Sequence, residues 1–169
     1  MFKLETERLI LREFCVADAA FMLEALTEPS FLHFIGDKGV RTIEETQQYI
    51  IDGPVDSYTR HGFGMYIVEL KSSGTPIGMS GLVKRDTLED ADVGFAFLPQ
   101  YWSQGYAYES TCAVMEFARS GLGLKRILGI TANDNVSSIR LLEKIGLRFE
   151  KMIRLTEDEP EIKLFVSEA

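Results

Sequence analysis

The chain has 169 residues, a length that suits one domain with a single hydrophobic core. Its formal net charge of −8 argues against a nucleic-acid-binding protein, which would need a basic surface. The acidity would suit a cationic substrate, although acidity alone commonly serves solubility.

Apolar residues make up 46% of the chain and charged residues 26%, as in ordinary globular enzymes. An apolar run of about 18 residues, the length of a membrane span, is missing, and so is a signal-peptide pattern. Cys15 and Cys112 are far apart and lack metal-ligand spacing. We therefore expect a cytoplasmic protein with reduced thiols, no metal site and no contact with membranes or nucleic acids.

Hydrophobic periodicity predicts alternating strands and helices over one domain, residues 1–169. In chain order we expect a strand at 8–12, helices at 19–26 and 42–51, strands at 63–71, 77–84 and 93–98, a helix after Gly105, a strand at 126–131, a helix after Asn135, and a closing hairpin of 149–155 with 162–166. The apolar strand at 126–131 is flanked by helices, which indicates a buried, parallel position.

Capping and breaking residues set the expected helix bounds. Asp18 can cap the first helix, and Pro29 is expected to stop it. Thr42 and Glu45 have the spacing of a capping box. Gly53-Pro54 is expected to end the second helix near residue 51.

The turn from Trp102 to Ala107 joins a strand to a helix, and Gly105 lies within it. The first N–H groups of a helix have no intrahelical partner and carry partial positive charge, so such a turn can bind a phosphate. Glycine also permits close backbone approach. An ordinary strand-to-helix turn would use glycine in the same way.

A second polar turn follows the next strand. Asn133 and Asn135 end that strand, and Ser138 stands in the first turn of the following helix. Asn135 could simply cap the helix. However, both turns follow the C-terminal ends of consecutive strands, where open α/β sheets bind ligands. Together they predict a slot for a long phosphorylated cofactor.

Four segments in register resemble one known family, and they span almost the whole chain. They are Thr6–Arg12 with Asp18 ("TERLxLR…D"), Ile77–Leu82 ("xIGxxGL"), Tyr101–Glu109 ("YWGxGYATEA") and Asn135–Leu147 ("NxxSxxLxEKxGF"). The chain thereby resembles the GNAT superfamily of N-acetyltransferases, in particular its ribosomal-protein N-terminal acetyltransferases (RimJ/RimL-like).

The resemblance implies a mixed α+β fold, with a twisted mixed sheet that is antiparallel in its first half and helices on both faces. It implies acetyl transfer from acetyl-CoA to a primary amine, most simply a protein N-terminal α-amine. The alternatives are a small-amine acetyltransferase (acting on a polyamine, amino acid or drug), a non-catalytic acetyl-CoA-binding protein, or a dimerisation module with a decayed site. A homodimer is compatible with each.

The resemblance also assigns cofactor-binding residues. The pyrophosphate would lie on the backbone N–H groups of Ser103, Gln104, Gly105, Tyr106 and Ala107. The pantetheine arm would follow the strand edge at Phe95, Ala96 and Phe97, where one N–H would polarise the thioester carbonyl. Asn135 would bond to the arm, and Ser138 would lie near the sulfur.

Four positions depart from the superfamily pattern. Trp102 replaces a common Arg or Gln, Ser103 replaces Gly, and Tyr108 replaces Thr. Leu142 stands where many relatives place a tyrosine that protonates the leaving thiolate. Ser138 is the nearest remaining hydroxyl, and it is equally a plain helix-start residue.

Direct attack on the thioester needs a neutral amine. An α-amine of pKa about 7.8 is roughly a tenth neutral at pH 7, whereas a lysine of pKa about 10.4 is almost wholly charged. Asp92 and Glu109 are the candidate general bases. Each has a structural alternative: Asp92 as a residue of the central strand, and Glu109 as a first-turn acid that the helix dipole favours.

The first two helices and the final hairpin line the acceptor site in this superfamily. That implies Phe31, His33, Phe34 and Tyr66 as acceptor-site residues, together with the acidic segment 157–159. His33 and the second histidine, His61, are both expected in loops.

Overall fold

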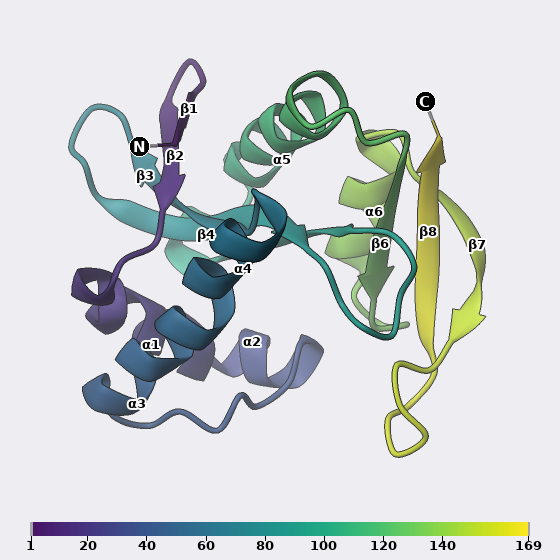
Figure 1. Ribbon diagram of the computed structural model, residues 1–169, viewed down its shortest axis with the longest axis horizontal. Helices are drawn as coiled ribbons and strands as arrows, with labels where there is room; N and C mark the ends of the chain where they lie inside the picture. Colours follow the sequence, from purple (N-terminus) through teal and green to yellow (C-terminus); the bar gives the residue numbers. More distant parts are fainter. Residues whose placement is uncertain (1, 169) are drawn as a thin grey trace.

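The computed structural model describes residues 2–168, and its central feature is one mixed sheet with the strand order β1-β2-β3-β4-β5-β6-β8-β7 (Figure 1). The strands are β1 (Lys3–Glu5), β2 (Leu9–Glu13), β3 (Met65–Leu70), β4 (Pro76–Val83), β5 (Asp92–Phe97), β6 (Arg126–Thr131), β7 (Arg148–Ile153) and β8 (Ile162–Glu168). Neighbours pair antiparallel throughout, except that β5 and β6 are parallel. The expected mixed sheet with an antiparallel first half is confirmed.

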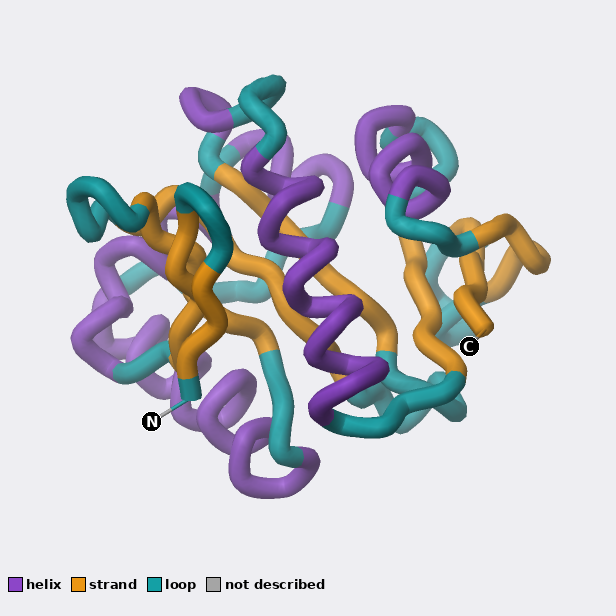
Figure 2. Tube along the Cα trace, turned by 90° about the horizontal axis from the view of Figure 1, so that it is seen from above, coloured by secondary structure: helices purple, strands orange, loops and turns teal. Residues whose placement is uncertain are grey.

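Helices cover both faces of the sheet, as expected (Figures 1 and 2). They are α1 (Ala19–Thr27), α2 (Pro29–Phe34), α3 (Ile43–Ile50), α4 (Asp56–His61), α5 (Tyr106–Glu116) and α6 (Val136–Lys144). None of the helices within residues 2–168 is long and apolar enough to cross a membrane.

The two faces bury separate cores because strand side chains alternate between them. On β3, Val68 belongs to the buried cluster that also holds Val114 of α5 and Leu142 of α6. Its neighbour Ile67 packs on the opposite face with Met22 of α1 and with the buried end of α3. The sheet therefore separates a face covered by α5 and α6 from a face covered by α1 and α3.

The helix expected to end before Gly53-Pro54 continues instead. A wide π-type turn over Ile51–Val55 carries the chain past Pro54 into α4, which ends at Gly62 with φ 76°. Pro54 has no N–H to donate, and a locally wider turn accommodates it without ending the helix. The left-handed conformation at Gly62 is a common helix end.

Pro29 also begins a helix rather than only stopping one. It occupies the first turn of α2, where a missing N–H costs nothing, and the Glu28 carboxylate accepts from the N–H groups of Ser30 and Phe31. His33 therefore lies in α2 and His61 in α4, so the expectation that both histidines lie in loops was wrong.

The capping predictions fared unequally. Thr42 and Glu45 form the predicted capping box at the start of α3. Asp18 makes no side-chain cap bond to α1, because its carboxylate instead binds the guanidinium of Arg12, with distances of 2.8 and 2.9 Å.

The sheet opens between β5 and β6. These strands pair only at Asp92 with Leu128 and at Val93 with Gly129, whereas β6 pairs with β8 along its whole length. β6 is therefore parallel to β5, as expected, but only over two residues, and it is antiparallel to β8. β5 is a central strand, yet it is buried only at Asp92 and Val93 and half-buried from Gly94 onward. α5 packs on the β4–β5 side of this opening and α6 on the β6 side (Figure 2).

Candidate active site

α5 begins after the C-terminal end of β5, the part of the strand that no longer pairs with β6. Gly105 occupies the N-cap position in a left-handed conformation, with φ 85°, and it has no side chain to accept a hydrogen bond. By contrast, Thr42 caps α3 and Asn135 caps α6. The first N–H groups of α5 are therefore left for an external acceptor, and the helix dipole favours a negatively charged one.

The loop before α5 is held by bonds at both ends. The indole N–H of Trp102 donates to the carbonyl of Phe97 at 2.7 Å, and the amide of Gln104 donates to the carbonyl of Gln100 at 3.0 Å. Between them, Ser103 adopts φ 61°, the one positive value at a residue other than glycine in the described chain. The glycine common in the superfamily would adopt this conformation without strain.

The edge of β5 facing the opening presents the backbone of alternate residues. Leu98 donates to Ile77 across the β4–β5 pair, and Ala91 accepts from Leu128 on the other side. Because backbone groups alternate along a strand, those of Phe95 and Phe97 face the opening, while those of Ala96 face β4. The carbonyl of Phe97 already accepts from Trp102. Phe95 is therefore the residue beyond Val93 whose N–H and carbonyl both face the opening and are both left for a ligand.

The start of α6 supplies polar groups from the β6 side. The Asn135 side-chain oxygen accepts from the N–H of Ser138 at 3.3 Å, so Asn135 does cap α6. Its amide nitrogen and the Ser138 hydroxyl make no hydrogen bond to any residue from 2 to 168. Both remain available as donors to a ligand in the opening.

Leu142 follows Ser138 by one helical turn on the same face of α6. Leu142 is 1% exposed, and a Cβ added to Gly129 would lie 2.7 Å from its side chain. It fills the space above the glycine of β6 and offers no proton. Ser138 is accordingly the hydroxyl of α6 nearest the opening on that face.

Asp92 lies at the base of the opening, on the last part of β5 still paired with β6. Its carboxylate is 1% exposed and accepts from Nε of Arg85 at 2.9 Å. Burial raises the pKa of Asp92, against the opposing charge and hydrogen bond of Arg85. The structure thus makes Asp92 a buried ion-pair partner, and its role as a general base stays a prediction.

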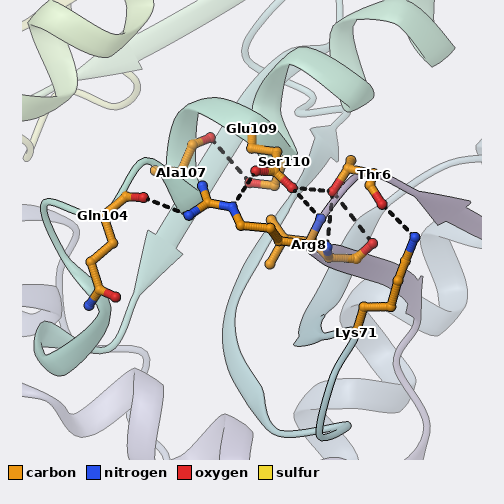
Figure 3. A network of polar contacts seen from close by, with 8 residues as sticks. Thr6, Arg8, Lys71, Gln104, Ala107, Glu109 and Ser110 are labelled. Atoms are coloured by element: carbon orange, nitrogen blue, oxygen red, sulfur yellow. Dashed lines mark hydrogen bonds and ion pairs between the residues drawn. The ribbon is translucent and has the colours of Figure 1, made fainter.

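Glu109, the other candidate base, is fully engaged (Figure 3). It accepts from the backbone N–H of Arg8 at 2.9 Å, from Nε of Arg8 at 2.8 Å and from the Thr6 hydroxyl. Burial alone would raise its pKa, but these hydrogen bonds and the charge of Arg8 hold the pKa of Glu109 below its usual value. An ionised, fully bonded carboxylate is a poor proton acceptor.

Three of the four predicted acceptor residues lie on α2, where the rings of His33 and Phe34 are in contact, whereas Tyr66 lies apart on β3. Phe31 is buried in the core beneath α1 and α3, while Phe34 is half-buried at the end of α2. Tyr66 is 1% exposed and stacks between Phe2 and Tyr58, with ring centroids 4.4 and 5.5 Å away. Burial raises its pKa to about 12. Tyr66 therefore belongs to the core on the α5 face and lines no open surface, because even residues of β3 point into that face.

His33 is exposed and lies beside the opening. Its Nε2 is 3.2 Å from a carboxylate oxygen of Asp134, in the loop between β6 and α6. This contact joins the helical layer of α2 to the loop that precedes Asn135. Asp134 was missed from the sequence because its partner is 101 residues away and no local pattern signals the pair.

Arg85 was also missed. It lies between β4 and β5, and its guanidinium binds Asp92. Burial raises the pKa of Tyr49 on α3, and the nearby charge of Arg85 partly lowers it again. Arg85 therefore faces both α3 and the base of the opening. In the sequence it merely ends an apolar run, which gave no signal of this position.

Taken together, β5 and β6 part after Val93, α5 begins without a side-chain cap, and backbone groups of β5 face the opening. The family model "Acetyltransferase (GNAT) domain" matches residues 8–148, and the chain belongs to this family. It is an N-acetyltransferase by family.

Relatives and solved structures agree with this assignment. The chain is 29% identical over 153 residues to the "uncharacterized N-acetyltransferase YoaA" of Bacillus subtilis, covering 89% of this chain and 85% of YoaA. An acetyltransferase structure from Agrobacterium tumefaciens superposes with a TM-score of 0.85 at 21% identity, covering 100% and 95% of the two chains. A Salmonella typhimurium acetyltransferase, described as modifying the N-terminal serine of ribosomal protein L7/L12, superposes with a TM-score of 0.78 at 16% identity, covering 97% and 96%.

Proposed function

We propose that the protein transfers the acetyl group of acetyl-CoA to the N-terminal α-amine of a protein or peptide. The observation that carries the proposal is the opening of the sheet after Val93, together with the uncapped start of α5 that follows the end of β5. Ser103 to Ala107 would bind the pyrophosphate through backbone N–H groups. Phe95 and Phe97 would bind the pantetheine arm along the strand edge, with the Asn135 amide opposite.

Acetyl-CoA, when bound, supplies an activated thioester carbonyl. In transfer, the neutral amine forms the new C–N bond, the C–S bond breaks, and the departing thiolate takes up a proton released by the amine. The N–H of Phe95 would donate to the carbonyl oxygen as negative charge develops on it. The Ser138 hydroxyl would donate a hydrogen bond to the leaving sulfur.

The choice of an α-amine rests on the carboxylates. Asp92 is buried and bound to Arg85, and Glu109 is bound to Arg8 with a lowered pKa, so we expect neither carboxylate to act as the general base. An α-amine of pKa about 7.8 needs little help to become neutral, whereas a lysine or polyamine needs a strong base. The named specificity of the Salmonella typhimurium neighbour points in the same direction.

Thiol release from acetyl-CoA tests the proposal with two acceptor pools. One pool holds short peptides with free N-termini and no lysine, and the other holds polyamines. We expect turnover with the peptides. Turnover of polyamines alone would refute the α-amine acceptor and require a base, while cofactor binding without turnover of any amine would indicate a binding protein.

Gly105→Val provides the control for the cofactor site. A β-branched residue at φ 85° is strained and would block close approach of the phosphates. We expect this variant to lose acetyl-CoA binding. Unchanged affinity would remove the α5 start from the proposed site.

A further inference from the structure

Arg8 reaches the loop of the proposed phosphate site from a distant part of the chain. It lies in the turn between β1 and β2, about a hundred residues before α5 (Figure 3). Its Nη1 donates to the carbonyl of Gln104 at 3.1 Å, and its guanidinium carbon lies 4.4 Å from the centre of the Tyr106 ring. A Cβ added at Gly105 would lie 3.2 Å from its Nη2. One side chain therefore contacts three consecutive residues of the loop.

Glu109 fixes Arg8 in this position. Its carboxylate binds the side chain and the backbone N–H of Arg8, at 2.8 and 2.9 Å, and accepts from the Thr6 hydroxyl. Lys71 at the end of β3 donates to the carbonyl of Thr6 at 2.6 Å. The turn, the first turn of α5 and the neighbouring hairpin are thus connected by charge-assisted hydrogen bonds, the stronger class of such bonds.

The loop needs support from outside itself. It contains two left-handed residues, Ser103 and Gly105, and α5 begins without a side-chain cap. The carboxylate of Glu109 also lies in the first turn of α5, where its charge would repel a bound pyrophosphate. Arg8 supports the loop through the Gln104 carbonyl, and its positive charge neutralises Glu109.

We propose that Arg8 is a positioning residue of the cofactor site, which orients the Gln104–Tyr106 backbone toward the pyrophosphate and offsets the charge of its anchor, Glu109. The inference rests on the proposed use of acetyl-CoA. It concerns the phosphate-bearing half of the donor and leaves the acceptor open.

A truncated donor separates this role from a general effect on folding. Acetyl-pantetheine carries the thioester and the arm but no pyrophosphate. We expect Arg8→Met, which keeps the aliphatic stem over Tyr106, to raise KM for acetyl-CoA about tenfold, equivalent to about 1.4 kcal/mol. KM for acetyl-pantetheine should change less than about twofold, within the scatter expected for such comparisons.

Arg8→Lys distinguishes positioning from simple charge. A lysine carries the charge but cannot reach Glu109 and the Gln104 carbonyl together through a planar fork. We expect it to resemble Arg8→Met. If Arg8→Lys retains the KM of the wild type, Arg8 acts as a point charge on the phosphates and the positioning role is overturned.

Arg12 is a matched control in the adjoining strand. It forms comparable ion pairs with Asp18 and Glu69, at 2.8 and 3.1 Å, away from the phosphate loop. Arg12→Met should lower thermal stability and leave the ratio of the two KM values unchanged. If Arg8→Met raises both KM values equally, as a misfolded site would, the inference fails.

Calorimetric titration with CoA, without any acceptor, distinguishes failure of the proposed function from failure of the role proposed for Arg8. If the wild type does not bind CoA, the proposed function and this inference fail together. If the wild type binds CoA and Arg8→Met binds it equally well, the inference alone fails.

Discussion

Two neighbouring positions of the phosphate loop should respond to substitution with opposite signs. Ser103 and Gly105 both have positive φ, 61° and 85°, but only the second is glycine. The Ser103 side chain is exposed, and its hydroxyl makes no hydrogen bond within residues 2–168. Ser103→Gly therefore removes strain without removing a contact, whereas Gly105→Ala introduces strain.

The magnitude follows from two opposing terms. A left-handed conformation costs a non-glycine residue about 1–2 kcal/mol. Glycine lowers the free energy of unfolding by about 0.4–1 kcal/mol, because it raises the entropy of the unfolded chain. The difference spans about 0–1.6 kcal/mol, so Ser103→Gly should stabilise by about 0.8 kcal/mol, the middle of that range, which corresponds to a Tm rise of roughly 2–3 °C for a chain of this size. Gly105→Ala should destabilise by a similar amount or more, because its methyl group would press on Arg8 at 3.2 Å.

Thermal unfolding followed by circular dichroism measures both variants, and CoA titration reports on the site. We expect Ser103→Gly to bind CoA at least as tightly as the wild type, because it restores the residue that suits the loop. Destabilisation by Ser103→Gly, or a Gly105→Ala variant as stable as the wild type, would refute the strain argument.

Three further predictions address the carboxylates and Ser138. Because the folded-state pKa of Glu109 is lowered, its ionised form stabilises the fold above the unfolded value of about 4.3, and that stability is lost as pH falls through the folded pKa. Glu109→Gln should therefore be less stable than the wild type at pH 7 in urea titrations, and the difference in unfolding free energy should shrink as pH falls from the unfolded value through the lower folded pKa. A difference that does not change with pH in the acid range would exclude the ionised carboxylate as its source. The kcat/KM for a peptide acceptor should rise with pH until about 7.7–8.0, the pKa of the α-amine. Asp92→Asn should show the same rise, and loss of the rise in this variant would make Asp92 the base. Ser138→Ala should lower kcat about tenfold with little change in KM for acetyl-CoA, as loss of one hydrogen bond to a developing charge predicts, and an unchanged kcat would leave Ser138 as a helix-start residue only.

Local sequence signals predicted the sheet and most helices because each depends on near neighbours. The capping box of Thr42 and Glu45 and the start of α5 at Gly105 were read directly from residue type and spacing. The same local reasoning failed at Gly53-Pro54, where buried packing of Pro54 and Ile50 keeps the chain helical through a wide turn. A breaker residue predicts a boundary only where tertiary packing does not outweigh it.

Long-range partners could not be predicted in this way. The sequence placed Asp92 and Glu109 near the site but gave no indication that Arg85 and Arg8 bind them. Tyr66 failed for a related reason, since the face of β3 on which it lies is set by the register with β4 and not by its own residue type. The site residues therefore stay predictions from residue type, whereas the pairing of Asp92 with Arg85 and of Glu109 with Arg8 came only from the fold.

That pairing connects the fold to the chemistry at one position of β5. Up to Val93 the strand lies between two partners, and Asp92 is sealed there against Arg85. From Gly94 onward the strand loses β6 and turns the backbone of Phe95 toward the opening. Both candidate carboxylates are therefore engaged in ion pairs on the β5 side of the opening, Asp92 with Arg85 and Glu109 with Arg8. The groups that we propose for transfer are neutral, namely backbone N–H groups, the Asn135 amide and the Ser138 hydroxyl. We propose that such a site stabilises developing charge but removes a proton poorly, which favours an acceptor amine that is already partly neutral near pH 7.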